Sequence, residues 1–190
     1  MPEFEWLDVM LAIAAGVGLA AATGLRVFLP MLVLGCAARA EWIPLGADFG
    51  WLASNAGLIT LAMATLAEVA AYYLPVIDNA LDVVATPAAV IAGIVTLAAV
   101  TSDLPAPMRW TLAIIAGGGT AGMVQSLTTV ARLKSTGFTA GLANPLLATI
   151  ELVGALGVSV LAVVAPLLAI VGAVMIVAIY RRLRTKRVRT

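Results

Sequence analysis

Long apolar runs dominate this sequence and constrain its fold more than any other feature. They cover about residues 7–24, 25–38, 56–76, 80–100, 110–131, 142–163 and 165–181. A helix needs about 20 apolar residues to cross a bilayer, and the last five runs have about that length. Apolar residues make up 63% of the chain, against about 45–50% in a soluble domain. The sequence therefore predicts an all-α, polytopic transmembrane protein with about six spans.

The first two runs do not fit one straight span. Together they would form a helix of about 46 Å, whereas the hydrocarbon layer is ~30 Å thick. We expect a break near Thr23 and Gly24, just before Arg26 and Pro30. Pro30 cannot donate a backbone hydrogen bond, so the carbonyl of Arg26 loses its helical partner. The first helix is either broken or re-entrant, with Arg26 pointing at a site, or it ends near residue 24 and Arg26 reaches the membrane interface.

Three pairs of segments hint at an internal repeat. Residues 11–18 match 112–119, residues 64–70 match 148–153, and residues 81–93 match 161–172, in the same order. This predicts one transmembrane domain over residues 1–190, built from pseudo-repeat halves at 7–100 and 110–182. Three spans in each half would insert the second half upside down, as in many secondary transporters.

The basic residues predict the orientation of the chain. Six of the eleven lie in the tail 181–190, which the positive-inside rule places in the cytoplasm. The loop with Arg132 and Lys134 would then also be cytoplasmic, and the loop with Asp103 and Arg109 would lie outside. We expect a multi-pass protein of the bacterial inner membrane whose main partner is the lipid bilayer.

Charged residues inside the spans are candidates for function, because a charge there costs about 2.5–3.5 kcal/mol unless it is paired or hydrated. Arg26, Glu68 and Glu151 qualify. Arg26 suits a carboxylate, a phosphate or an internal glutamate. Glu68 and Glu151 lie near the middle of their spans and would titrate at the repeat interface. The alternative is a static Arg–Glu pair that only fixes helix packing.

Further polar residues complete a predicted substrate-binding set. Asp78 and Asp82 share one helical face, either as a cap and a first-turn carboxylate or as substrate contacts. Gln125 and Asn144 supply neutral hydrogen-bonding groups along the access path, and Asn144 with Pro145 marks the start or a break of a span. The glycine-rich segment 116–122 lacks the ending of a phosphate loop, so we expect close helix packing there.

Several kinds of chemistry have no support in the sequence. The chain has no histidine and a single cysteine, Cys36, so we expect no metal site, cofactor or disulfide. Only carboxylate chemistry would be open to an enzyme, and we expect neither catalytic activity nor nucleic-acid binding.

The polar residues resemble the pattern of a bacterial family of small integral membrane proteins defined as a domain of unknown function. The residues that carry the resemblance are Gly24, Leu25, Arg26, Pro30, Glu68, Ala71, Pro75, Asp78, Asp82, Ala131, Lys134, Asn144 and Glu151. The chain departs from the pattern at Tyr72 and Tyr73, where an Asp-Lys pair is expected. The resemblance supports the choice of site residues and implies no substrate.

Two functions from different classes stay open. The first is a small transporter or flippase for an anionic or zwitterionic solute or lipid headgroup, with Arg26, Glu68 and Glu151 at its centre. The second is a membrane scaffold, or assembly protein, whose buried charges lock the helices together. Either could work as a homo-oligomer.

Overall fold

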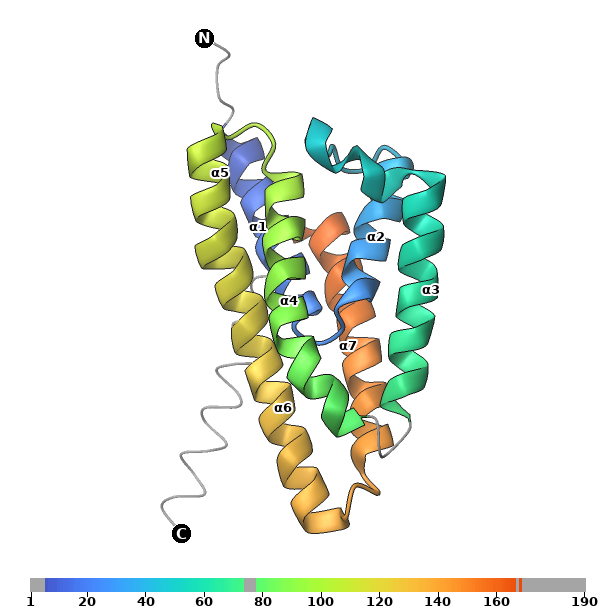
Figure 1. Cartoon of the computed structure of the whole chain (residues 1–190). Helices are drawn as coiled ribbons and strands as arrows, with labels where there is room; N and C mark the ends of the chain where they lie inside the picture. The colour runs from blue at the N-terminus through green and yellow to red at the C-terminus, as the bar shows by residue number, and fades with distance from the viewer. Residues whose placement is uncertain (1–5, 74–77, 167, 169–190) are drawn as a thin grey trace, which may run out of the picture.

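A computed structural model of the chain describes residues 6–73, 78–166 and 168, and the side chains of residues 78–83 are not described. The described residues form helices joined by turns (Figure 1). The α-helices are α1 (Trp6–Thr23), α2 (Phe28–Arg39), α3 (Asn55–Tyr72), α4 (Asp78–Val100), α5 (Ala106–Leu112), α6 (Gly119–Thr139) and α7 (Asn144–Val164). The 3-10 helix η1 covers Ala47–Ala53, and the π-helical stretch η2 covers Ala113–Gly118.

The first two apolar runs form a hairpin of two separate helices. Helix α1 ends at Thr23 and α2 begins at Phe28, so the chain breaks where the sequence predicts. Figure 1 shows α1 and α2 running in opposite directions, and their turn lies inside the bundle. The hairpin therefore starts and finishes at the same end of the molecule, as a re-entrant segment does.

Three of the described helices, α1, α3 and α7, are long enough and apolar enough to cross a membrane. Helix α2 and the 84–100 part of α4 are shorter apolar helices. Large apolar side chains cover the outside of the bundle, and Ile59, Met63 and Leu66 on α3 are all more than 60% exposed. This surface is the one that lipid would solvate.

The fifth apolar run differs from the prediction. Helices α5, η2 and α6 follow one another without a break, and α6 continues to Thr139. Arg132 and Lys134 therefore lie in a helix and not in a loop. The helix stops where Ala140 and Gly141 take positive φ angles of 51° and 85°, which is a left-handed ending that favours glycine.

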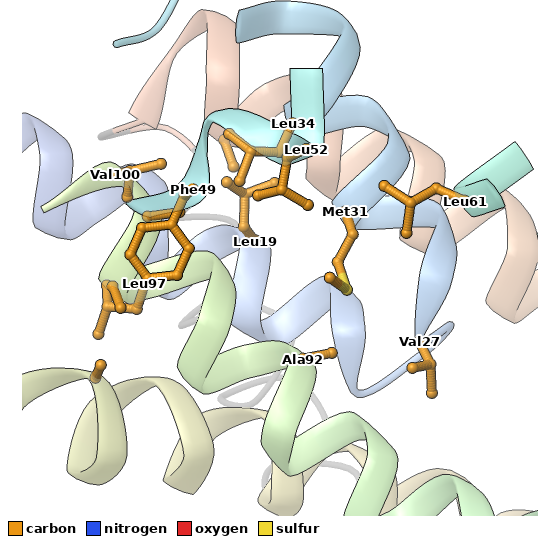
Figure 2. Packing of buried hydrophobic residues seen from close by; sticks show 14 of the residues in the cluster. Leu19, Val27, Met31, Leu34, Phe49, Leu52, Leu61, Ala92, Leu97 and Val100 are labelled. Atoms are coloured by element: carbon orange, nitrogen blue, oxygen red, sulfur yellow. The ribbon is translucent and has the colours of Figure 1, made fainter. Parts of the chain in front are cut away.

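Two kinds of packing hold the bundle together. At the end where η1 lies, Leu19, Leu34, Leu52 and Leu97 fill the core (Figure 2). Between α4 and η2 the backbones almost touch, because a Cβ atom on Gly117 would lie 2.5 Å from the carbonyl oxygen of Gly93. The glycine-rich segment 116–122 thus serves close helix packing, as expected.

Candidate functional site: a buried charge cluster at the helix break

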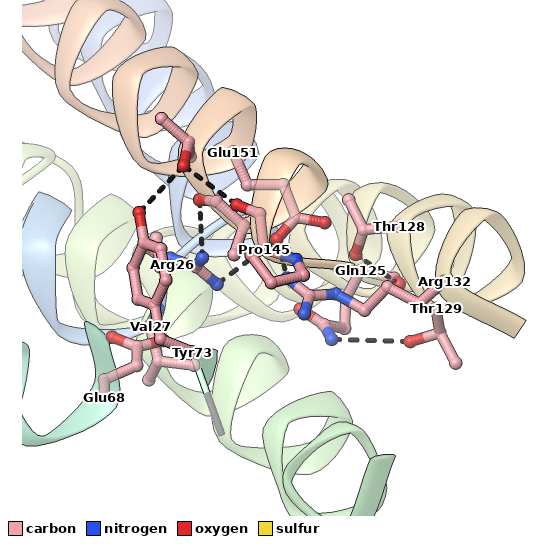
Figure 3. A network of polar contacts seen from close by, with 12 residues as sticks. Arg26, Val27, Glu68, Tyr73, Gln125, Thr128, Thr129, Arg132, Pro145 and Glu151 are labelled. Carbon is pink, nitrogen blue, oxygen red and sulfur yellow. Dashed lines mark hydrogen bonds and ion pairs between the residues drawn. The ribbon is translucent and has the colours of Figure 1, made fainter. Parts of the chain in front are cut away.

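Arg26 lies in the turn between α1 and α2 and is only 1% exposed. Its Nη1 lies 3.2 Å from Oε2 of Glu151 on α7, and its Nη2 donates a hydrogen bond of 2.7 Å to the carbonyl of Ala148 (Figure 3). The interpretation in which Arg26 reaches the membrane interface is therefore wrong, because its guanidinium is enclosed by protein.

A second buried arginine joins the first. Arg132 on α6 is 1% exposed, and its Nη2 forms an ion pair with the same Glu151 Oε2 that Arg26 contacts. The sequence predicts a loop around Arg132, and Arg132 is not among the predicted site residues. The sequence offers one clue, the spacing of seven residues from Gln125, which puts both residues on one face of a helix. In the structure both are buried.

Tyr72 connects the two arginines. It is buried at the last position of α3, and the Cζ atoms of Arg26 and Arg132 lie 4.2 and 4.0 Å from the centre of its ring. A tyrosine at the end of a span usually lies at the headgroup level. The Tyr72 ring instead contacts both cations, which aromatic rings attract through their quadrupole.

Glu68 has a different environment from Glu151. Its Oε1 accepts a hydrogen bond of 2.8 Å from the backbone N–H of Val27, and its Oε2 accepts one of 3.2 Å from that of Phe28. The first N–H groups of a helix have no partner within the helix, and no side chain of its own caps α2. Glu68 therefore caps the second half of the broken helix from α3.

Gln125 and Asn144 lie beside this cluster. Gln125 is buried on α6, and a Cβ atom on Gly24 would lie 3.0 Å from its backbone nitrogen. Asn144 begins α7 and donates from Nδ2 to Thr136 Oγ1 at 3.1 Å. It is buried on the same helical face as Ala148 and Glu151. Five predicted residues, Arg26, Glu68, Gln125, Asn144 and Glu151, thus line one region of the bundle.

Comparison with known families agrees with the resemblance seen in the sequence. The sequence model of a domain of unknown function, DUF4126, matches residues 13–186. The chain belongs to the DUF4126 family. Neither a curated protein nor a solved structure matches it.

Some of the predicted features of this DUF4126 protein fall outside the described residues. They are the side chains of Asp78 and Asp82, residue Pro75, most of the run 165–181 and the basic tail 181–190. Helix α4 begins at Asp78, and the choice between capping and substrate contact for the two aspartates stays a prediction. Among the described residues, no group of three His, Cys, Asp or Glu side chains could hold a metal ion.

A described cavity lies away from the charge cluster. It has a volume of about 360 Å³ and is lined by Ala38, Glu41, Ile43, Pro44, Leu45, Gly50 and Ala53. These residues belong to the end of α2, the following loop and η1, whereas the charge cluster surrounds the beginning of α2. The arginines are enclosed by α3, α6 and α7 instead.

Proposed function

We propose that this protein is a small transporter or flippase that carries an anionic group across the membrane. The observation that carries the proposal is the convergence of two buried guanidinium groups, from Arg26 and Arg132, on one carboxylate oxygen of Glu151. Guanidinium groups match the geometry of carboxylates and phosphates. Broken helices also form the substrate sites of many membrane carriers, where the N-terminal ends of half-helices face anionic groups.

The arrangement of the helices gives the proposal partial support. Glu68 and Glu151 occupy matching positions of the sequence repeat, and their helices α3 and α7 run in opposite directions (Figure 1). An inverted repeat requires this opposition. Helix α1 and the α5–α6 helix, which carry the matched residues 11–18 and 112–119, run in the same direction, so this pair does not fit an inverted repeat of the halves 7–100 and 110–182.

Transport would require the enclosed cluster to open. Arg26 sits at the tip of the α1–α2 hairpin, which is joined to α3 through the two hydrogen bonds of Glu68. A movement of the tip away from α6 or α7 would expose both arginines without unfolding a helix. The structure would then correspond to the closed state between two open ones.

The scaffold function has an observation of its own in its favour. Arg26 is 1% exposed and paired with Glu151, which is what a purely structural ion pair requires. Removing one partner of a buried pair costs about 3–5 kcal/mol. A scaffold should therefore lose stability when Arg26 is removed, and it should not respond to ligands.

Thermal unfolding of the detergent-purified protein separates the two functions. Wild type and Arg26→Ala would be heated with a panel of inorganic anions, phospholipids and polyprenyl phosphates. A carrier should be stabilised by at least one of them, and Arg26→Ala should remain folded but lose this response. Arg109→Ala is the matched control. Arg109 pairs with the exposed Asp48 at 3.3 Å, and neither residue belongs to the charge cluster. The scaffold function is favoured if none of these compounds stabilises the wild type and Arg26→Ala melts many degrees lower.

A further inference from the structure

We propose that the carboxylate of Glu151 occupies the binding site of a phosphate monoester group. When the substrate binds, its phosphate displaces Glu151 from Arg26 and Arg132. This inference rests on the proposed function and deepens it, since it names both the substrate class and the internal group with which the substrate competes. It follows from how the two buried glutamates and the two arginines are bound.

Displacing the side chain of Glu68 and displacing that of Glu151 would break different kinds of contact. Both oxygens of Glu68 accept hydrogen bonds from backbone N–H groups at the start of α2. Its removal would leave helix-terminal donors without a partner inside the protein, which is costly. The described ion pairs of Glu151 instead involve side chains only, and both are made by Oε2. Glu151 can therefore be replaced by another anion without damage to a helix.

The two arginines have supports that do not depend on Glu151. Arg26 also donates to the carbonyl of Ala148 at 2.7 Å, and both guanidinium groups lie within 4.2 Å of the centre of the Tyr72 ring. Stacking on an aromatic face holds a guanidinium group and leaves its N–H edge available. The two cations would thus stay close together after Glu151 had left.

A phosphate monoester suits such a pair better than a single carboxylate does. Glu151 brings one negative charge and offers one oxygen to both arginines. A phosphate monoester carries about −1.5 to −2 charges at pH 7 and has three acceptor oxygens. Each guanidinium group could then make its own charge-assisted, two-pronged contact. The phosphate could belong to a soluble ester or to a lipid headgroup, and the chemistry at the arginines would be the same.

The variant Glu151→Gln tests this inference, because it removes the internal charge and keeps the shape of the side chain. Binding of inorganic phosphate and of dihexanoyl phosphatidic acid would be measured by calorimetry on wild type and variant in detergent, with acetate as the control anion. We expect the phosphate probe that fits to bind the variant at least about tenfold more tightly, which corresponds to about 1.4 kcal/mol. A preference for inorganic phosphate indicates a soluble ester, and a preference for phosphatidic acid indicates a lipid.

Glu68→Gln is the matched control, since it changes the formal charge equally within the same region. It should increase the affinity for phosphate less than Glu151→Gln does, because Glu68 binds the backbone and does not occupy the arginines. Equal gains in the two variants would contradict the inference, since they would reflect the general loss of negative charge. An unchanged or weaker affinity in a folded Glu151→Gln protein would also contradict it.

The stability of Glu151→Gln provides a second readout. The variant should melt below wild type, and the bound phosphate probe should restore part of the loss by replacing the missing charge. A variant that unfolds alike with and without either phosphate probe contradicts the inference. A transport assay in proteoliposomes distinguishes this inference from the proposed function. If Glu151→Gln binds phosphate more tightly but the bound probe does not cross the membrane, transport is refuted and the exchange at Glu151 is supported. Movement of another anion by wild type, with no gain in Glu151→Gln, would refute only the exchange.

Discussion

At the scale of single residues, Glu68 connects the charge cluster to the backbone of the helix break. Glu68→Ala would leave the N–H groups of Val27 and Phe28 without their acceptor. The free energy of unfolding should fall by about 2 kcal/mol, the upper range for loss of a helix cap. Unfolding in mixed detergent micelles would measure it, with the exposed Asp103→Ala as the control. A loss no larger than that of the control would show that the cap contributes nothing.

The same scale shows what could be predicted about the site. Arg26, Glu68 and Glu151 stand out in the sequence because a charge within an apolar run must be compensated. Arg132 does not, because it lies beyond the apolar run in a polar segment where an arginine normally meets water. Tyr72 does not stand out either, since a tyrosine at a span end usually faces the headgroups. Which carboxylate each arginine binds depends on packing, which one sequence does not specify.

At the scale of elements, the α1–α2 turn depends on a close contact with α6. A Cβ atom on Gly24 would lie 2.5 Å from the carbonyl oxygen of Ala121 and 2.6 Å from Cβ of Val124. The break itself could be predicted from chain length and from Pro30. The return of the chain as a hairpin could not, because its direction follows from contacts such as this one between segments far apart in the sequence.

Gly24→Ala should therefore destabilise the protein by about 1–3 kcal/mol, the usual cost of overpacking. The neighbouring atoms are mostly backbone, which cannot move aside as a flexible side chain can. Gly119→Ala on α6, the helix that Gly24 contacts, is a fitting control, since a Cβ atom there meets nothing within 4 Å. It should be stabilising by about 0.5–1 kcal/mol, because alanine favours a helix interior. Equal melting temperatures for the two variants would contradict the close approach of the turn to α6.

At the scale of the whole molecule, the hairpin determines which ends of the helices share a side of the membrane. The start of α1, the end of α2, η1 and α5 all lie at one end of the bundle, and the turn between α6 and α7 lies at the other (Figure 1). The ion pair of Asp48 with Arg109 and the hydrogen bond from Gly46 N–H to the Ala99 carbonyl, 2.9 Å long, fix the first group together. If α1 and α2 together crossed the membrane as one broken span, residue 8 would instead lie on the other side of the membrane from residue 48.

Single cysteines introduced into a Cys36→Ser background would test this topology in intact cells. Asp8→Cys, Asp48→Cys and Asp103→Cys lie at exposed positions of the first end, and Phe138→Cys lies near the α6–α7 turn at a position that is 89% exposed. We expect a membrane-impermeant maleimide to label the first three from the outside. The predicted span 165–181 would bring the basic tail to the side of the α6–α7 turn, and the positive-inside rule predicts that this side is cytoplasmic. Phe138→Cys should react only after the cells are opened. Labelling of the cysteine at residue 8 from the side opposite to residues 48 and 103 would mean that α1 and α2 together cross the membrane. Arg26 would then belong to a kinked span and not to the tip of a hairpin, and the opening movement proposed for the carrier would lose its basis.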